Sequence, residues 1–188
     1  MNGFRAGGAV KRWESNGRPA PPPDKVKQDV VLEYGQRYGT SSLVETGTYL
    51  GDMIEAVKGD FSHIYSIELD KSLHDRARER FSGQDHIELI EGDSAAHIGR
   101  ILGELDSPAL FWLDAHGDQT PIYEELTQIL DAPDEGHIML IDDARFFGKF
   151  PAYRTMDDLK EFVLSKRRNL DIAVEYDIIR ITPQEMSR

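Results

Sequence analysis

Two adjacent aspartates, Asp142 and Asp143, follow an apolar run in the segment "HIMLIDDARFF" at residues 137–147. Neighbouring carboxylates repel each other, so at the end of a buried strand they need a cation or hydrogen bonds to hold them. Acidic residues also end or follow the four preceding strand-like segments: Glu45, Glu68, Asp93 and Asp114. One acid after a strand means little because loops are exposed to water. Five acidic strand ends in succession predict a shared site.

Seven strand-like segments must position these acids. They lie at residues 42–46, 63–69, 87–91, 109–114, 137–142, 171–175 and 177–182. Apolar residues at helical spacing separate the first five, which is typical of an α/β protein. We expect a doubly wound, Rossmann-like, mostly parallel sheet of about seven strands with a C-terminal antiparallel hairpin and helices on both faces. Ligands bind such sheets beyond the carboxyl ends of the strands, where the acids are expected to converge.

The first 22 residues are rich in glycine, proline and charge and show no clear period. They predict a flexible, extended N-terminal arm, with a flap over the site as the alternative. Residues 23–188 are expected to form one domain, since the chain is too short for two. Its first helix is predicted over residues 24–39, with Asp24 as cap and Gly39 as stop. Thr155 and Asp158 predict a capping box for a helix that runs to about residue 168.

The composition restricts the partners. Lysine and arginine number 22 against 34 acidic residues, which gives a formal net charge of −12. A surface this acidic disfavours nucleic acid and anionic lipid, and the absence of cysteine excludes disulfides and zinc–thiolate sites. No apolar run approaches the roughly 20 residues of a membrane span, and the N-terminus lacks signal-peptide features. We expect a cytoplasmic protein with a small-molecule partner; a homodimer is left open.

The segment "VETGTYLGD" (residues 44–52) follows the first strand and opens a helix. Gly47 and Gly51 allow a tight turn and a close approach of the backbone to a ligand at the helix N-terminus. Glu68 ends the second strand, where an acid accepts hydrogen bonds from a ribose diol. Glu45 would repel a pyrophosphate but would suit an ammonium group. An adenosine-type ligand with an ammonium group, S-adenosylmethionine, is therefore favoured.

The segments "LVETGTYLG", "IYSIELD", "IELIEGDS" and "FWLDAHGD" resemble the successive motifs of the class I S-adenosylmethionine-dependent methyltransferases. The resemblance spans residues 24–183, although Tyr49 stands where the family commonly has a third glycine. It implies that residues 23–188 are a methyltransferase domain with Glu45 and Gly47 near the methionine part of the cofactor. It likewise implies that Glu68 contacts the ribose and Asp93 with Ser94 the adenine. The full predicted cofactor-binding set is Glu45, Gly47, Thr48, Gly51, Glu68, Asp93, Ser94 and Asp114.

Asp114, Asp142 and Asp143 end two neighbouring strands, and three close carboxylates raise one another's pKa unless a cation neutralises them. Oxygen ligands suit a hard cation, so we predict Mg²⁺ at these residues. The arrangement is similar to the metal-dependent catechol-type and sugar O-methyltransferases. A metal would lower the pKa of an acceptor hydroxyl and orient it. His116 is the predicted general base beside Asp114, with Asp118 as a second candidate base or ligand.

Simpler interpretations remain open. Asp142 could cap its loop, Asp143 could pair with Arg145, and His116 could be an ordinary loop histidine. The favoured function is O-methylation of a small hydroxylated molecule, a sugar or polyol, assisted by a divalent metal. A nicotinamide-dependent oxidoreductase would also use Glu68, although the G-x-G-x-x-G pattern is missing. A non-catalytic cofactor-binding module of the same fold is the third alternative.

Overall fold

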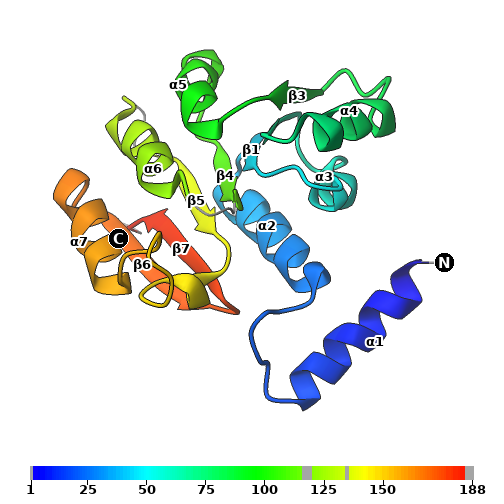
Figure 1. The fold of residues 1–188 in the computed structure, drawn as a ribbon, viewed down its shortest axis with the longest axis horizontal. Coiled ribbons are helices and arrows are strands. Elements are labelled where there is room, and N and C mark those ends of the chain that lie inside the picture. Colours follow the sequence, from blue (N-terminus) through cyan, green and yellow to red (C-terminus); the bar gives the residue numbers. More distant parts are fainter. Residues whose placement is uncertain (1, 116–119, 134–135, 185–188) are drawn as a thin grey trace.

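The computed structural model describes residues 2–115, 120–133 and 136–184. A seven-stranded sheet in the order β3-β2-β1-β4-β5-β7-β6 forms its centre (Figure 1). The strands are β1 (Ser42–Thr46), β2 (His63–Glu68), β3 (Ile87–Glu91), β4 (Leu110–Leu113), β5 (Ile138–Ile141), β6 (Leu170–Glu175) and β7 (Ile178–Pro183). The first five strands pair in parallel, while β7 pairs antiparallel with both β5 and β6. The predicted mostly parallel sheet with a terminal hairpin is confirmed.

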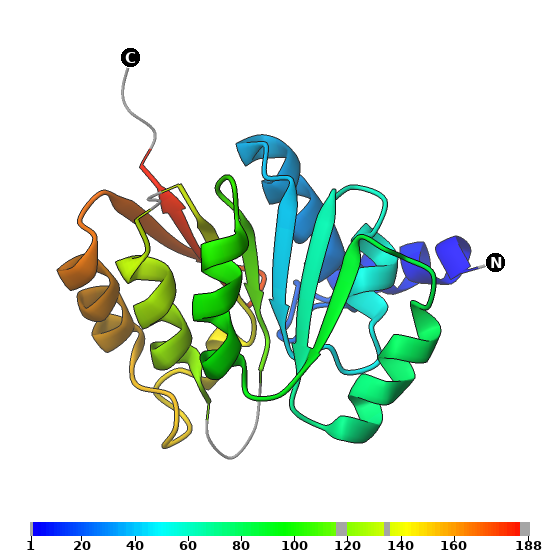
Figure 2. The same cartoon turned by 90° about the horizontal axis from the view of Figure 1, so that it is seen from above.

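Helices cover both faces of the sheet, as predicted (Figures 1 and 2). They are α1 (Asn2–Ser15), α2 (Asp24–Tyr38), α3 (Asp52–Val57), α4 (Lys71–Arg80), α5 (Ser94–Glu104), α6 (Ile122–Asp131) and α7 (Met156–Lys166), with a 3-10 turn η1 (Ala144–Phe146). One core cluster joins α2, α3 and α4 to the sheet and contains Trp112, whereas Phe111 lies in the other cluster with α5, α6 and α7. Alternate residues of β4 thus enter opposite cores, because side chains alternate across a strand.

Parallel pairing brings the strand ends to one edge of the sheet. The amide of Asp114 donates to the Thr46 carbonyl at 3.0 Å, and the amide of Asp142 donates to the Leu113 carbonyl at 3.1 Å. The amide of Gly47 donates to the Ile67 carbonyl at 2.9 Å. These bonds continue the ladder one residue past the strands, so the first loop residues are held by sheet geometry.

The helix ends follow local sequence signals with one correction. Gly39 ends α2 in the left-handed conformation, as predicted, but Asp24 is the first helical residue and Pro23 takes the N-cap position. Proline fixes its own φ near the value that this position needs, so a side-chain cap is not required for the helix to begin. Thr155 and Asp158 form the predicted capping box at the start of α7.

The N-terminal segment differs from its prediction in conformation, because residues predicted as an extended arm form helix α1. Trp13 at its end is buried, packs edge-on against Tyr176 at 5.4 Å, and donates its indole N–H to the Pro19 carbonyl at 2.7 Å. An aromatic anchor supplies the order that glycine content alone argues against. Within the described residues, no helix combines the length and apolar character needed to cross a membrane.

Candidate functional site

Two adjoining cavities lie at the carboxyl ends of β1, β2 and β4. The larger has a volume of about 1010 Å³ and the smaller about 250 Å³. Gly47, Tyr49 and Asp114 line both, so the turn after β1 and the end of β4 form their shared boundary. The predicted cofactor residues Glu68, Asp93 and Ser94 line the larger cavity, whereas Glu45 and Thr48 line the smaller one. The acids that end or follow the first four strands thus line these two cavities, whereas Asp142 and Asp143 line neither.

Gly47 occupies a position that only glycine fits. Its φ is +87°, and a Cβ added there would lie 2.6 Å from the Asp114 carbonyl oxygen. The close approach of the two backbones draws the β1 turn against the end of β4, at the boundary between the two cavities. Gly51 lines neither cavity; it begins α3 in the left-handed region, where a Cβ would meet the Phe81 ring at 2.6 Å.

Glu68 organises this turn from the neighbouring strand. One carboxylate oxygen accepts the backbone N–H of Tyr49 at 2.8 Å, and the other accepts that of Asp70 at 2.9 Å. Tyr49 has a positive φ of 49°, while its side chain is 65% exposed and lines both cavities. Each carboxylate oxygen can accept a further hydrogen bond, so Glu68 can fix the turn and still accept from a ligand hydroxyl.

Glu45 is buried beneath the turn with 1% of its surface exposed. Its carboxylate accepts the Ser66 hydroxyl at 2.5 Å, and the Ser66 hydroxyl lies 2.6 Å from that of Thr48. Burial raises the pKa of Glu45 to about 8 against the lowering effect of the Ser66 hydrogen bond. At neutral pH this group is therefore mainly protonated, and a ligand ammonium would favour its ionised form.

Asp93 and Ser94 carry structural contacts besides lining the larger cavity. The Asp93 side chain caps α5 by accepting the Ala95 amide at 3.0 Å. Ser94 donates to the buried Glu125 carboxyl at 2.5 Å, and burial raises the pKa of Glu125 to about 7. Because the Ser94 hydroxyl donates to Glu125, it can meet a ligand only as a hydrogen-bond acceptor.

The paired aspartates have separate partners. Asp142 is 1% exposed and is paired with the Lys27 ammonium, which comes from α2. Burial raises the pKa of Asp142 to about 7, Asp114 raises it further and Lys27 opposes both. Asp143 instead pairs with Arg145, which also pairs with the buried carboxylate of Asp177. The simpler interpretation of Asp143 as a partner of Arg145 matches these contacts.

No protein-family model and no curated protein sequence matches the chain. Solved structures do match over nearly its whole length. An O-methyltransferase from Bacillus cereus in complex with SAH has a TM-score of 0.67 at 13% identity, covering 98% of this chain and 92% of that one. The O-methyltransferase TomG from Streptomyces achromogenes, in complex with SAM, has a TM-score of 0.64 at 16% identity with the same coverage. The SAH-bound methyltransferase PaMTH1 from Podospora anserina has a TM-score of 0.63 at 20% identity, covering 94% and 88%.

The chain has the class I methyltransferase fold. The strand order, with β7 inserted between β5 and β6, agrees with the predicted resemblance. Identities of this size establish the fold and leave the chemistry to be argued from the site.

The predicted Mg²⁺ site requires that the carboxylates of Asp114, Asp142 and Asp143 meet around one ion. Among the residues that the structure describes, Asp114, Asp142 and Asp143 do not form a group whose ligand atoms all lie within 4.8 Å. Lys27 holds Asp142 and Arg145 holds Asp143. These contacts do not fit a divalent ion bound by the three predicted ligands. His116, the predicted base, and Asp118 lie outside the described residues.

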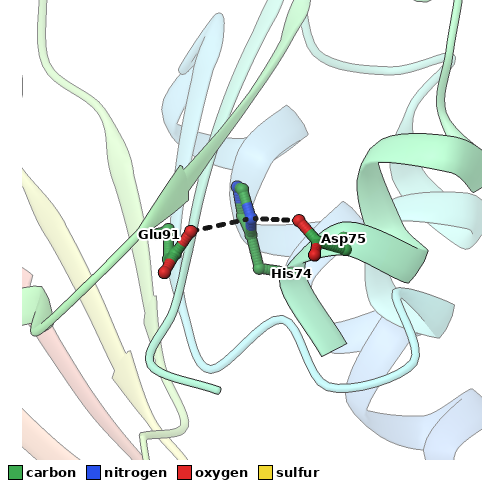
Figure 3. A group of neighbouring side chains, drawn as sticks. All are labelled: His74, Asp75 and Glu91. Carbon is green, nitrogen blue, oxygen red and sulfur yellow. Dashed lines mark ion pairs between the residues drawn. The ribbon is translucent and has the colours of Figure 1, made fainter. Parts of the chain in front are cut away.

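A second cluster of titratable side chains lies between α4 and the end of β3 (Figure 3). His74, Asp75 and Glu91 bring ligand atoms within 4.8 Å of one another, and the buried His74 Nδ1 lies 3.6 Å from Asp75 and 3.7 Å from Glu91. The Lys71 ammonium lies 2.8 Å from Asp75 and 3.8 Å from Glu91. The Lys71 ammonium thus already offsets part of the charge of these two carboxylates, and the cluster connects α4 to β3.

The aromatic residues after the paired aspartates pack inward. Phe147 and Tyr153 are buried in the core beneath α7, with ring centroids 5.4 Å apart, and Phe146 packs against Tyr153 at 5.5 Å. None of the three lines either cavity. They support the base of their loop.

Lys27 is the functional candidate that sequence reasoning missed. It lies in a helix of alternating charge, where a lysine reads as a solvated surface residue. Its side chain is only 16% exposed, and it lines the smaller cavity together with Asp24 and Gln28. The only sequence signal is the surplus of acids at the strand ends, which calls for a cation without saying where it comes from.

Proposed function

We propose that this protein is an S-adenosylmethionine-dependent methyltransferase that methylates a hydroxyl group of a small, hydroxylated acceptor such as a sugar or polyol. The observation that carries the proposal is the boundary between the two cavities at Gly47 and Asp114. A donor-sized cavity and a smaller one meet where the glycine turn after β1 lies against the end of β4. The cofactors named with the structural neighbours support the same donor.

Each part of the donor has a suitable wall in this proposal. Glu68, with lone pairs remaining on both oxygens, accepts from the ribose hydroxyls. Asp93, which lines the same larger cavity, faces the adenine in this proposal. The methionine end then reaches the shared boundary, where Glu45 and Asp114 can pair with its ammonium.

The charge of the smaller cavity favours a neutral acceptor. Carboxylates outnumber ammonium groups in its wall even with Glu45 protonated, because Asp24, Asp52 and Asp114 accompany the single cation Lys27. An acidic acceptor would meet this surplus of carboxylates, whereas hydroxyl groups can donate to them. The volume of about 250 Å³ suits a molecule of monosaccharide size.

Methyl transfer itself needs little from the protein beyond position. The acceptor oxygen attacks the methyl carbon in line, the carbon–sulfur bond breaks, and the sulfonium becomes the neutral thioether of S-adenosylhomocysteine. The hydroxyl proton leaves to a base, and His116 is the proposed base. The turn at Gly47 and the clamp by Glu68 hold the donor so that only one face of its methyl group meets the acceptor cavity.

Calorimetric titration with S-adenosylhomocysteine tests the proposal. We expect one site per chain, and we expect Glu68→Gln to weaken binding at least tenfold because a charged acceptor for the ribose hydroxyls is lost. Gln retains the shape of the residue, and a melting curve checks that the turn survives. Titration with NAD⁺ is the comparison: preferential NAD⁺ binding would favour an oxidoreductase, and a chain that binds neither ligand would refute a cofactor site.

A further inference from the structure

The Lys27 ammonium pairs with Asp142, one of the three carboxylates that the sequence predicts as metal ligands. It crosses from the first turns of α2 to the end of β5 and pairs with Asp142, 115 positions along the chain. Its side chain is 16% exposed and that of Asp142 is 1% exposed, so water screens this pair only weakly. Lys27 and Arg145 thus supply the cations that pair with the two aspartates after β5.

The Lys27 ammonium is attracted by more than its direct partner. It pairs with Asp142, and the charges of Asp114 and Asp143 also act on it. Three carboxylates therefore act on one ammonium. The sequence predicts a metal ion that neutralises these carboxylates. In the structure, a lysine side chain supplies positive charge at the same residues.

An ion and this ammonium compete for the same oxygens. A divalent ion at Asp142 would have to displace Lys27 or lie within a few ångströms of it, where two positive charges repel. The remaining oxygen of Asp142, Oδ1, is buried and has no hydrogen-bond partner among the described residues. Without Lys27, both carboxylate oxygens of Asp142 would lose this cation. The carboxylates of Asp142 and Asp114 would then offer the oxygen ligands that a hard cation prefers.

We propose that Lys27 replaces the divalent metal ion in this site, so that it neutralises the strand-end carboxylates and holds Asp142 beside the acceptor cavity. Lys27 is then a positioning residue whose side chain lines the smaller cavity. The inference deepens the proposed methyltransferase function and rests on it for its catalytic meaning. It predicts that S-adenosylmethionine binds without divalent ions. It also predicts that Asp114, Asp142 and Asp143 do not bind such ions.

Binding of Mn²⁺, followed by electron paramagnetic resonance of the free ion, tests this inference. We compare the wild type, Lys27→Met and the matched control Lys25→Met, whose lysine lies on the same helix but pairs with Asp29 at the surface. Lys27→Met should create one site at least tenfold tighter than any in the wild type or in Lys25→Met. A second change, Asp142→Asn, should remove the new site. All proteins carry Glu91→Gln, which takes the cluster at His74 out of the measurement.

Stoichiometric Mn²⁺ binding by the wild type that Asp142→Asn abolishes would overturn the inference, and so would a Lys27→Met protein that gains no site. If Lys27→Met does not fold, Lys27→Arg replaces it, and the wild-type measurement decides: no binding by either protein supports the inference. Titration of the wild type with S-adenosylhomocysteine in chelator separates the two proposals. Failure to bind it refutes the methyltransferase function, whatever the manganese result.

Discussion

Glu45 should make the protein less stable as the pH rises. The side chain is 1% exposed, and burial raises its pKa to about 8 from an ordinary value of 4.5. The folded state therefore holds a proton that the unfolded chain releases at lower pH. The Ser66 hydrogen bond lowers the pKa but does not offset burial.

The magnitude follows from proton linkage. For a group whose folded pKa is raised, the stabilising contribution is fully present below the unfolded pKa and is lost as the pH rises through the folded pKa. A difference between 4.5 and about 8 corresponds to a total loss on the order of 5 kcal/mol. Between pH 6 and pH 9 the loss amounts to about 3 kcal/mol, because part of it is complete by pH 6.

Urea unfolding of the wild type and Glu45→Gln at pH 6 and pH 9 measures this loss. Gln cannot ionise, so the free energy of unfolding of the variant should gain about 3 kcal/mol on the wild type across this range. Asp142 and Glu125 titrate in both proteins and cancel in the difference. Glu33→Gln, at an exposed position on α2, is the control and should follow the wild type. A gap between wild type and Glu45→Gln that stays constant with pH would refute the reasoning.

Two further substitutions test the architecture around the site. Gly47→Ala should abolish binding of S-adenosylhomocysteine and lower stability, because φ is +87° and the new Cβ would lie 2.6 Å from a backbone oxygen at the end of β4. Gly59→Ala, whose Cβ would have nothing within 4 Å, is the control in both assays. If Gly47→Ala binds as well as Gly59→Ala, the proposed role of the turn is contradicted. Arg145→Met should lower the free energy of unfolding by roughly 3 to 5 kcal/mol, because it leaves the buried carboxylates of Asp143 and Asp177 without their cation. Denaturation at neutral pH checks this, and an unchanged midpoint would show that the ion pairs contribute nothing.

The sheet could be predicted because its strands carry their signal locally. Runs such as residues 109–114 are continuously apolar, as a strand covered on both faces must be. Each strand ends where its apolar run stops, so the sequence alone assigns Glu45, Glu68 and Asp114 to one edge of the sheet. The parallel register brought them to the two cavities.

The partners of these acids could not be predicted in the same way. Lys27 and Asp142 are 115 positions apart and meet only because α2 packs across β4 and β5. Ser94 lines the larger cavity, as the prediction of an adenine contact requires, but its hydroxyl also donates a hydrogen bond to Glu125. The sequence gives no sign of this partner on α6. Local patterns identify which residues are charged, whereas long-range packing decides which charges pair.

The N-terminal helix shows a related limit. Glycine content argued against order in the first residues, but Trp13 packs against Tyr176, 163 positions later in the chain. An aromatic contact of this range outweighs weak local propensity.

A crystal structure of the complex with S-adenosylhomocysteine tests the central claim most directly. The account predicts the ribose hydroxyls at Glu68, the adenine near Asp93, and the thioether sulfur beside Gly47, facing the smaller cavity. A ligand bound elsewhere, or one whose sulfur faces away from the smaller cavity, would contradict the account.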